Sequence, residues 1–272
     1  MALAYRMLGS LAGAEDAVQE AYVRWHATDR TRIQSPRAFL SRVVTRLCLD
    51  ELKSARSRRE TYVGPWLPEP VLDDEALAVE AENEYADDLS VALLLTLERL
   101  SPLERAAFLL HDVFDLSFAE VGETLGRGEA ACRQLAARAR EHVRSARPRF
   151  QRSAEEGTEL ATAFHRATQT GDLAALTKFL ARDAVLYTDG GGKRAAALNP
   201  IYGADRIIRF LAGTTRKAGP VRMKAARING LPGMIIAEED GQITTTAYET
   251  HDGEITAIYV VRNPDKLRRI AF

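Results

Sequence analysis

The stretch from Ser101 to Arg149, SPLERAAFLLHDVFDLSFAEVGETLGRGEAACRQLAARAREHVRSARPR, decides the fold of this chain. Ser101-Pro102-Leu103-Glu104 and Ser117-Phe118-Ala119-Glu120 each place a serine three residues before a glutamate, which is the pattern of a capping box at a helix start. Pro102 suits the first helical position, where its missing N–H costs nothing. The two glycines of Leu125-Gly126-Arg127-Gly128 favour a tight turn. The stretch therefore predicts a helix, a short turn and a second helix, which is the helix-turn-helix pattern.

The helix expected from Glu129 to about Arg147 has two different faces. At 100° per residue, the face expected to pack carries Ala131, Cys132, Leu135, Ala139 and Val143. The other face offers guanidinium and amide groups, which recognise base edges and bind phosphates. The residues expected to contact DNA are Arg127, Arg133, Gln134, Ala137, Arg138, Arg140 and Arg144. A merely solvated arginine-rich helix is the alternative, and the capped helix and glycine turn before it favour DNA binding.

Length and composition indicate a globular protein of two or three domains. The chain has 272 residues, of which 46% are hydrophobic. No apolar run is long enough to cross a bilayer, and no signal peptide is recognisable at the start. The two cysteines, Cys48 and Cys132, fall on apolar helix faces and are expected to be buried thiols. We therefore expect a cytoplasmic protein.

The net charge of −1 hides a strong segregation of charge along the chain. Residues 30–60 and 127–149 are rich in arginine, whereas residues 69–88 carry acidic groups and no lysine or arginine. Because an acidic tether joins two basic modules, we expect both basic modules to bind nucleic acid.

Residues 3–60 are predicted to be helical. Leu3 to Leu8 begin inside an apolar pattern with no cap before them, so we expect this first module to be short at its N-terminus. A turn over 9–13 leads to an amphipathic helix from Ala14 to Trp25, with Ala17, Val18, Ala21, Tyr22 and Trp25 facing inward. Ser35-Pro36 opens a third helix, which buries apolar residues and exposes mostly cations.

In order and spacing, these features resemble a bacterial extracytoplasmic function (group 4) sigma factor, with region 2 first and region 4 second. Three strings narrow the resemblance to the sigma-J-like subgroup, which carries a C-terminal SnoaL-like domain. They are Tyr62-Val63-Gly64-Pro65-Trp66-Leu67-Pro68-Glu69-Pro70, Asp189-Gly190-Gly191-Gly192-Lys193 and Asn263-Pro264-Asp265-Lys266-Leu267.

The resemblance implies contacts with core RNA polymerase, through its β′ clamp helices and β flap, and with promoter DNA. The clamp-helix contacts would come from Asp16, Gln19, Glu20 and Arg24, and the −10 contacts from Arg37, Arg42, Arg46, Lys53 and Arg56. Those cations would supply sequence-independent phosphate affinity. The loop over 31–37 is the candidate for holding an unstacked −10 base. Thr45-Arg46 stands where many relatives carry Arg-Asn, so the preferred −10 base stays open.

The tether over 61–90 is expected to begin extended, because Pro65, Pro68 and Pro70 disfavour helix. In the family, this segment threads the polymerase cleft. Composition alone would favour a plain disordered linker, whereas Trp66 between prolines indicates a segment that docks.

Residues 150–272 predict an α+β cone of the nuclear transport factor 2 (NTF2) and SnoaL type. Helices are expected over 154–170 and 173–180, followed by a strand over 184–188 and a helix from about 204 to 211. Strands over 221–228, 234–238, 243–250 and 255–261 follow, with Asp252-Gly253 as a hairpin turn, and together predict a curled antiparallel sheet.

Relatives of this cone include enzymes, so five side chains are candidates for catalysis. They are His165, Tyr187, Asp189, Tyr248 and His251. Each has a plainer explanation: His165 as a packed or surface residue, Asp189 as a turn former beside glycines, and His251 as an exposed residue at the hairpin. No metal-ligand spacing or phosphate-binding glycine motif is present, and we expect no enzyme activity and no cofactor.

The resemblance implies regulation by the C-terminal domain, through contacts of the two C-terminal strings with the tether or the sigma modules. The residues expected in these contacts are Trp66, Leu67, Pro68, Asp189, Gly190, Gly191, Gly192, Lys193, Asn263, Pro264, Lys266 and Leu267. The predicted domains are region 2 over 1–60, the linker over 61–90, region 4 over 91–149 and the cone over 150–272. A DNA-binding regulator that acts without polymerase, a SnoaL-like enzyme with a DNA-binding extension, and a small ligand in the cone all stay open.

Overall fold

The computed structural model describes residues 1–29, 31, 33, 35–59, 62–72, 90–146, 154–215 and 221–272. The chain divides into two compact units, and the linker is shared between them. One unit contains Met1–Thr61 and Asp74–Arg147, and the other contains Tyr62–Asp73 and Pro148–Phe272. The first part of the linker therefore belongs structurally to the C-terminal domain.

The helical unit begins with a short helix followed by a longer one. Helix α1 (Ala2–Leu8) is buried along its whole length and ends at Gly9, whose φ is 65°. Helix α2 (Leu11–Ala27) starts three residues earlier than the predicted Ala14, because the Ser10 side chain accepts a hydrogen bond from the Gly13 N–H and caps it. The predicted inward face holds for Ala17 and Ala21, but Tyr22 is 62% exposed, so its placement in the core was wrong.

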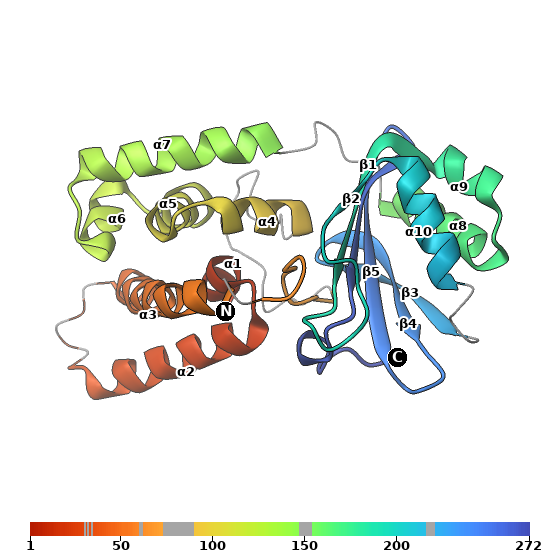
Figure 1. Cartoon of the computed structure of the whole chain (residues 1–272). Coiled ribbons are helices and arrows are strands. Elements are labelled where there is room, and N and C mark those ends of the chain that lie inside the picture. The colour runs from red at the N-terminus through yellow and green to blue at the C-terminus, as the bar shows by residue number, and fades with distance from the viewer. Residues whose placement is uncertain are drawn as a thin grey trace. The chain divides into compact units, whose positions relative to one another are not determined.

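Helix α3 (Pro36–Arg59) packs against both of these helices. Its N-terminus is capped as predicted, since Ser35 Oγ accepts a hydrogen bond from the Ala38 N–H. Cys48 and Leu52 are buried on its inner face. Figure 1 shows α2 and α3 running beside each other, with α1 next to both.

The remaining helices of this unit follow the predicted helix-turn-helix. They are α4 (Val91–Arg99), α5 (Pro102–Phe108), the π-helical turn η3 (Leu109–Val113), α6 (Phe118–Leu125) and α7 (Glu129–Ala146). Both predicted capping boxes are confirmed, Ser101 with Glu104 and Ser117 with Glu120.

The turn between α6 and α7 depends on two glycines. Gly126 ends α6 with φ of 64°, which is the left-handed region. Gly122 lies against the turn, and a Cβ there would approach Arg127 O to 2.7 Å.

Helix α7 packs through a slightly different face from the one expected. Cys132, Ala136, Ala139 and Val143 are buried, whereas Ala131 is exposed, so the predicted face was wrong at that position. The buried residues recur every three or four positions, as one face of a helix requires.

The other unit is an α+β fold built on one curled sheet. In the described residues its six strands have the order β2-β1-β6-β5-β4-β3. Their bounds are β1 Leu180–Asp189, β2 Ile201–Tyr202, β3 Arg222–Ile228, β4 Leu231–Ala237, β5 Ile243–His251 and β6 Glu254–Val261. The sheet is mixed rather than antiparallel as predicted, because β1 pairs in parallel with β6. The predicted hairpin at Asp252-Gly253 is confirmed, and both residues have positive φ.

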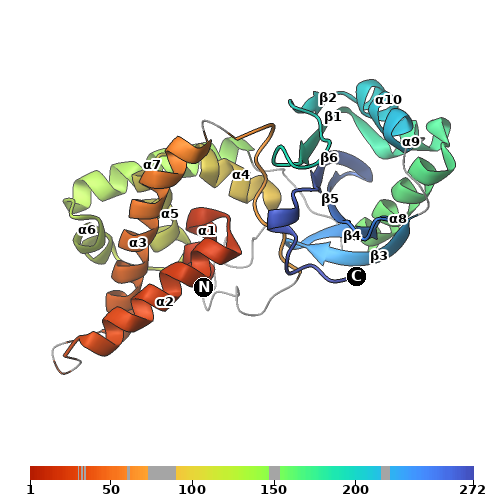
Figure 2. The same ribbon diagram turned by 60° about the horizontal axis from the view of Figure 1, so that its bottom comes forward.

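Helices α8 (Ala154–Thr170), α9 (Leu173–Phe179) and α10 (Ala204–Thr215) lie together on one side of this sheet (Figures 1 and 2). Buried residues between the helices and the sheet form the core; they include Ala161, Phe164, Leu176, Leu186, Ile207 and Tyr248. Figure 2 shows the sheet curling around these helices, which leaves a concave inner face. Within the described ranges, no helix has the length and apolarity that a membrane span requires.

Candidate functional site

The carboxylate of Asp189 is the centre of a polar cluster at the end of β1. This residue is fully buried. Its Oδ1 accepts a hydrogen bond from Tyr62 Oη at 2.5 Å, and its Oδ2 accepts one from the Leu67 N–H at 2.9 Å. The Lys266 ammonium pairs with Oδ2 at 2.7 Å. A buried carboxylate needs such partners, because an isolated charge in the interior is strongly unfavourable.

Lys266 binds the linker in two further ways. Its ammonium donates to Leu67 O, so both backbone groups of Leu67 are bonded. The same ammonium lies 4.3 Å from the ring centroid of Trp66 and 5.0 Å from that of Tyr62, which is cation–π geometry. We call Asp189, Asn263 and Lys266, together with Tyr62, Trp66 and Leu67 of the linker, the linker clamp.

Asn263 closes the clamp from the C-terminal side. Its Nδ2 donates to Tyr62 Oη at 2.9 Å, and its backbone N–H donates to Asp189 O at 2.9 Å. Burial, followed by the hydrogen bond to Asp189, raises the pKa of Tyr62, so its hydroxyl stays protonated and donates. Tyr62, Asp189 and Asn263 therefore meet at one point, although Tyr62 and Asn263 are far apart in the chain.

The glycine triplet lets the chain pass closely around the clamp. Gly191 has φ of 59°, and a Cβ there would lie 2.2 Å from Asn263 Nδ2. A Cβ on Gly192, with φ of 71°, would lie 3.2 Å from Val63 Cβ, and one on Gly190 would lie 2.1 Å from Arg194 O. A side chain at Gly191 would therefore displace Asn263, which holds Tyr62 of the linker.

The structure corrects the interpretation of Asp189 as a turn former. Its partners lie 122 and 127 residues upstream, at Leu67 and Tyr62, so no local pattern reveals them. The linker contact at Asn229 was also missed. Its backbone N–H donates to Val71 O at 2.7 Å, and its Oδ1 accepts from the Val71 N–H at 3.3 Å. An Asn-Gly pair is typical of a tight turn, and nothing in the sequence around Asn229 indicates the bond to Val71.

The other residues expected at this site lie around the clamp. Leu67, Pro68 and Leu267 are buried, and Pro264–Lys266 forms a single 3-10 turn capped by Asn263. Lys193 is exposed and pairs with Asp265 rather than with the linker.

Two of the five cations expected at the −10 element bind region 4 residues inside the helical unit. Arg37 donates to Phe114 O at 2.8 Å, and Arg42 pairs with Glu123 at 2.6 Å. Arg46 and Lys53 are exposed. The Arg56 side chain lies outside the described residues, as do parts of the loop over 31–37. The acidic stretch 73–89 is likewise outside them.

The residues expected on the polymerase lie together on the outer face of α2. Asp16, Gln19, Glu20 and Arg24 are all exposed. Tyr22 and Val23 are exposed beside them, at 62% and 56%, and add apolar surface that the sequence pattern did not assign to this face.

The candidate DNA-facing residues of α7 differ in how freely they are presented. Arg127, Gln134, Ala137, Arg138 and Arg144 are exposed. Arg133 is exposed as well, pairing with Glu129 at 2.9 Å and lying over the Phe118 ring. Arg140 is only partly exposed and pairs with Asp112, which ties α7 to η3. Its guanidinium already has a role in holding the helix-turn-helix together.

The catalytic candidates of the cone do not assemble into one constellation. His165 and Tyr248 meet across the domain core, with Tyr248 Oη 3.4 Å from Nδ1. Tyr187 stacks on Tyr259, and His251 lies 3.3 Å from Asp252 at the hairpin. Among the described residues, no group of three or more histidine, cysteine or acidic side chains could hold a metal ion.

Comparison with known protein families defines the class. The family model described as Sigma-70 region 2 matches residues 1–58, and that described as Sigma-70, region 4 matches residues 90–143. Helical modules of this kind, followed by an α+β domain, define a sigma factor with a C-terminal extension.

Individual relatives identify the family within the sigma factors. The chain is 41% identical to "ECF RNA polymerase sigma factor SigJ" of Mycobacterium tuberculosis, over 98% of this chain and 89% of the relative. It is 31% identical to "Probable ECF RNA polymerase sigma factor SigI" of the same species, over 97% and 90%. The crystal structure of M. tuberculosis SigJ matches with a TM-score of 0.77 at 37% identity, covering 98% of this chain and 94% of that one. The protein belongs to the extracytoplasmic function sigma factors.

Membership gives the general function. The protein directs transcription initiation by binding core RNA polymerase and promoter DNA. Its sigma factor relatives are not enzymes. The regulator that acts without polymerase is set aside by the same membership.

Proposed function

We propose that the C-terminal domain controls this sigma factor by holding the linker through the linker clamp. The observation that carries the proposal is the buried Asp189–Lys266 pair, which binds both backbone groups of Leu67. The domain acts in this role as a regulator rather than as a catalyst, beside the polymerase in the cytoplasm. A linker held in this way is not free to enter the polymerase cleft, so we infer that the clamp restrains initiation.

We assign the sigma modules to 1–60 and 91–149, the linker to 61–90 and the regulatory domain to 150–272. The exposed carboxylates of α2 would bind the β′ clamp helices, since acidic side chains suit a basic partner. The cations of α3 would bind the −10 element, and the exposed face of α7 would bind −35.

The closed helical unit supports a restrained state of the free protein. Arg37 and Arg42 donate to Phe114 and Glu123 of region 4, so part of the proposed −10 surface is occupied. Elements centred near −10 and −35 lie about 25 base pairs apart, which is roughly 85 Å at about 3.4 Å per step. Helix α3 is only about 36 Å long and contacts α6. Regions 2 and 4 must therefore separate to occupy both elements.

Run-off transcription with core polymerase tests this function through Lys266→Met. Loss of the ammonium leaves Asp189 buried without a cation, and breaking such a pair costs about 3–5 kcal/mol. We expect the linker to be released and transcription to rise at least threefold over the parent. Arg268→Met is the matched control, since Arg268 lies two residues after Lys266, is 76% exposed in its side chain and pairs with Asp265 rather than the linker.

Circular dichroism of both variants first establishes that each keeps the folded content of the parent. Transcription by folded Lys266→Met at or below the level of Arg268→Met would contradict the proposal.

A further inference from the structure

A cavity of about 740 Å³ lies inside the C-terminal domain, between helices α8 and α10 and the concave face of the sheet. Its volume falls within the range of roughly 300–1,000 Å³ that small-molecule sites occupy. Most of its lining is apolar and includes Phe164, Leu186, Phe210, Ile236, Ile258 and Val260. Such a lining favours an apolar molecule.

One end of the cavity carries an imidazole nitrogen without a partner. His165 lines the cavity, and its Nε2 is buried with no hydrogen-bond partner in the described structure. Nδ1 faces Tyr248 Oη at 3.4 Å. Burial lowers the pKa of His165, which keeps the ring neutral. Depending on which ring nitrogen carries the proton, Nε2 can donate a hydrogen bond to a hydroxyl or carbonyl oxygen of a ligand, or accept one from a hydroxyl group. A buried polar atom left unpaired points to a missing partner.

The polar wall of the cavity is part of a cluster of charged side chains that extends beyond the lining. Glu238 and Arg262 both line the cavity, and Glu238 pairs with Arg262 at 3.0 Å and with Arg194 at 2.7 Å. Two guanidinium groups and one carboxylate leave one positive charge. Arg194 does not line the cavity, so Arg262 is the guanidinium that an anionic oxygen in the cavity would meet.

We propose that this cavity binds an apolar organic acid. The acidic oxygens would lie at Arg262, the apolar body would fill the space under α8 and α10, and a hydroxyl or carbonyl oxygen would meet His165 Nε2. Burial of the body supplies affinity, and the two polar ends supply orientation.

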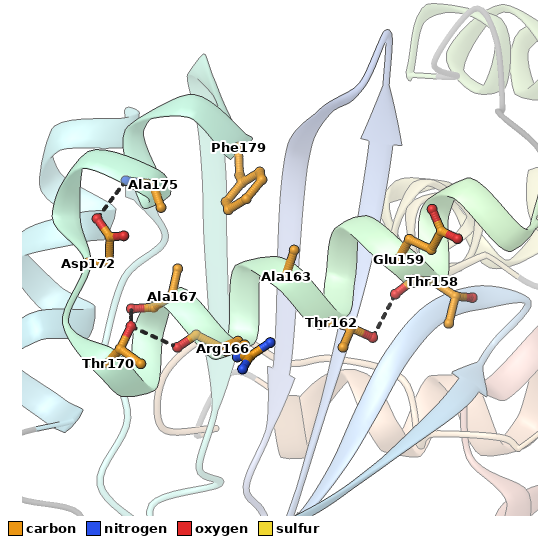
Figure 3. A pocket seen from close by; sticks show the side chains of 10 residues that line it. All are labelled: Thr158, Glu159, Thr162, Ala163, Arg166, Ala167, Thr170, Asp172, Ala175 and Phe179. Atoms are coloured by element: carbon orange, nitrogen blue, oxygen red, sulfur yellow. Dashed lines mark hydrogen bonds between the residues drawn. The ribbon is translucent and has the colours of Figure 1, made fainter.

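A second hollow, on the outer side of α8 and α9, lacks these features (Figure 3). Several of its polar groups are bonded within the helices: Thr162 and Thr170 donate to backbone carbonyls, and Asp172 caps α9. None of its lining residues lines the first cavity, which makes it a suitable place for a control substitution.

Isothermal titration of the full chain with 8-anilinonaphthalene-1-sulfonate tests the site. N-phenyl-1-naphthylamine is the neutral twin, with the same rings and no acidic group. We expect saturable one-to-one binding of the sulfonate, at least tenfold tighter than that of the amine. Absence of saturable binding, or equal affinity for both probes, would overturn the proposal.

Three substitutions, one of them a control, test where the probe binds. Val260→Trp fills the cavity and should abolish binding, whereas Thr162→Trp adds the same bulk on the exposed outer face of α8 and should leave the affinity unchanged. Arg262→Gln keeps the space and removes a charge, so it should weaken sulfonate binding at least fivefold and leave amine binding as it is. Sulfonate binding that survives both Val260→Trp and Arg262→Gln would show that the probe lies elsewhere.

The backbone joins the cavity wall to the linker clamp in two places. Thr188 lines the cavity and precedes Asp189, and Arg262 lines it and donates its backbone N–H to Asp189 O at 2.7 Å. A bound acid that stabilises this wall would also stabilise the grip on the linker; this step rests on the proposed function.

Saturating sulfonate should therefore lower run-off transcription by the parent at least twofold and leave Val260→Trp unaffected. If the sulfonate binds but does not lower transcription, the coupling between the cavity and the linker clamp is wrong, and the proposed binding site still stands. A failure of the proposed function is distinguished from this result, because transcription by Lys266→Met tests that function without any probe.

Discussion

At the scale of single residues, burial decides what a charged side chain does in this protein. Asp189 and Lys266 are held in a nearly dry cluster, with side chains 0% and 13% exposed. In such surroundings the two charges must stay together, and they constrain the linker that supplies their remaining hydrogen bonds. Exposed pairs such as Arg24–Glu20, with half-exposed side chains, contribute much less.

His165 should make the stability of the C-terminal domain depend on pH. Its pKa in the folded chain is lowered by burial, so the unfolded chain binds the proton more readily. The contribution is fully present above the unfolded pKa of about 6.5 and is lost as pH falls below it toward the folded value. Urea unfolding of the parent and of His165→Phe at pH 8, 6.5 and 5 measures this. The parent should lose more stability than the variant between pH 6.5 and 5.

An equal loss in the two proteins would show that His165 does not titrate in this way. The comparison cancels carboxylates that titrate in both chains, because only the residue at 165 differs.

Residue patterns predicted the clamp only in part. The glycines of 190–192 and the proline-flanked Trp66 stand out in the sequence. The grip of Asp189 on Leu67 does not, because a backbone N–H bonded across 122 residues leaves no periodic trace. The same holds for Asn229 and Val71, which are 158 residues apart.

At the scale of secondary-structure elements, local chemistry fixed most boundaries. Serine caps begin α2, α4, α5 and α6, and positive-φ glycines end α1 and α6. The parallel pairing of β1 with β6 was not predictable from the strand pattern, because alternation specifies a face and not a neighbour.

Helix α7 offers the sharpest test among the elements. Arg133 is exposed, and its pair with Glu129 is a surface pair worth about 0–1 kcal/mol, so Arg133→Ala should fold normally. If Arg133 contacts a base, the substitution should cost about 1–3 kcal/mol of promoter affinity and relax preference at one −35 position. Binding of the holoenzyme to a set of −35 variants by electrophoretic mobility shift measures both effects.

Arg99→Ala is the control, since Arg99 is exposed on α4, outside the helix-turn-helix. It should leave the −35 preference unchanged. Should Arg133→Ala discriminate among the variants as the parent does, the placement of α7 at −35 is wrong.

At the scale of the whole molecule, the division of the chain links its parts in an unexpected way. The linker that joins regions 2 and 4 belongs, over Tyr62–Asp73, to the C-terminal unit. A domain that holds the connection between two DNA-binding modules can govern how far they separate. The sequence predicted both modules and the cone, but composition alone favoured a free linker, because its polar partners are distant in the chain.

A reversible lock on the linker tests this central claim most directly. A Cβ at Gly192 would lie 3.2 Å from Val63 Cβ, close to the roughly 3.5–4.5 Å of a disulfide, so Val63→Cys with Gly192→Cys can cross-link the linker to the domain. The native Cys48 and Cys132 are buried and free. Run-off transcription with core polymerase is measured before and after reduction, with each single substitution as the control. The account predicts that the oxidised double variant initiates at least fivefold less than its reduced form, and that reduction does not change the single variants. Equal transcription by the oxidised and reduced double variant would contradict it.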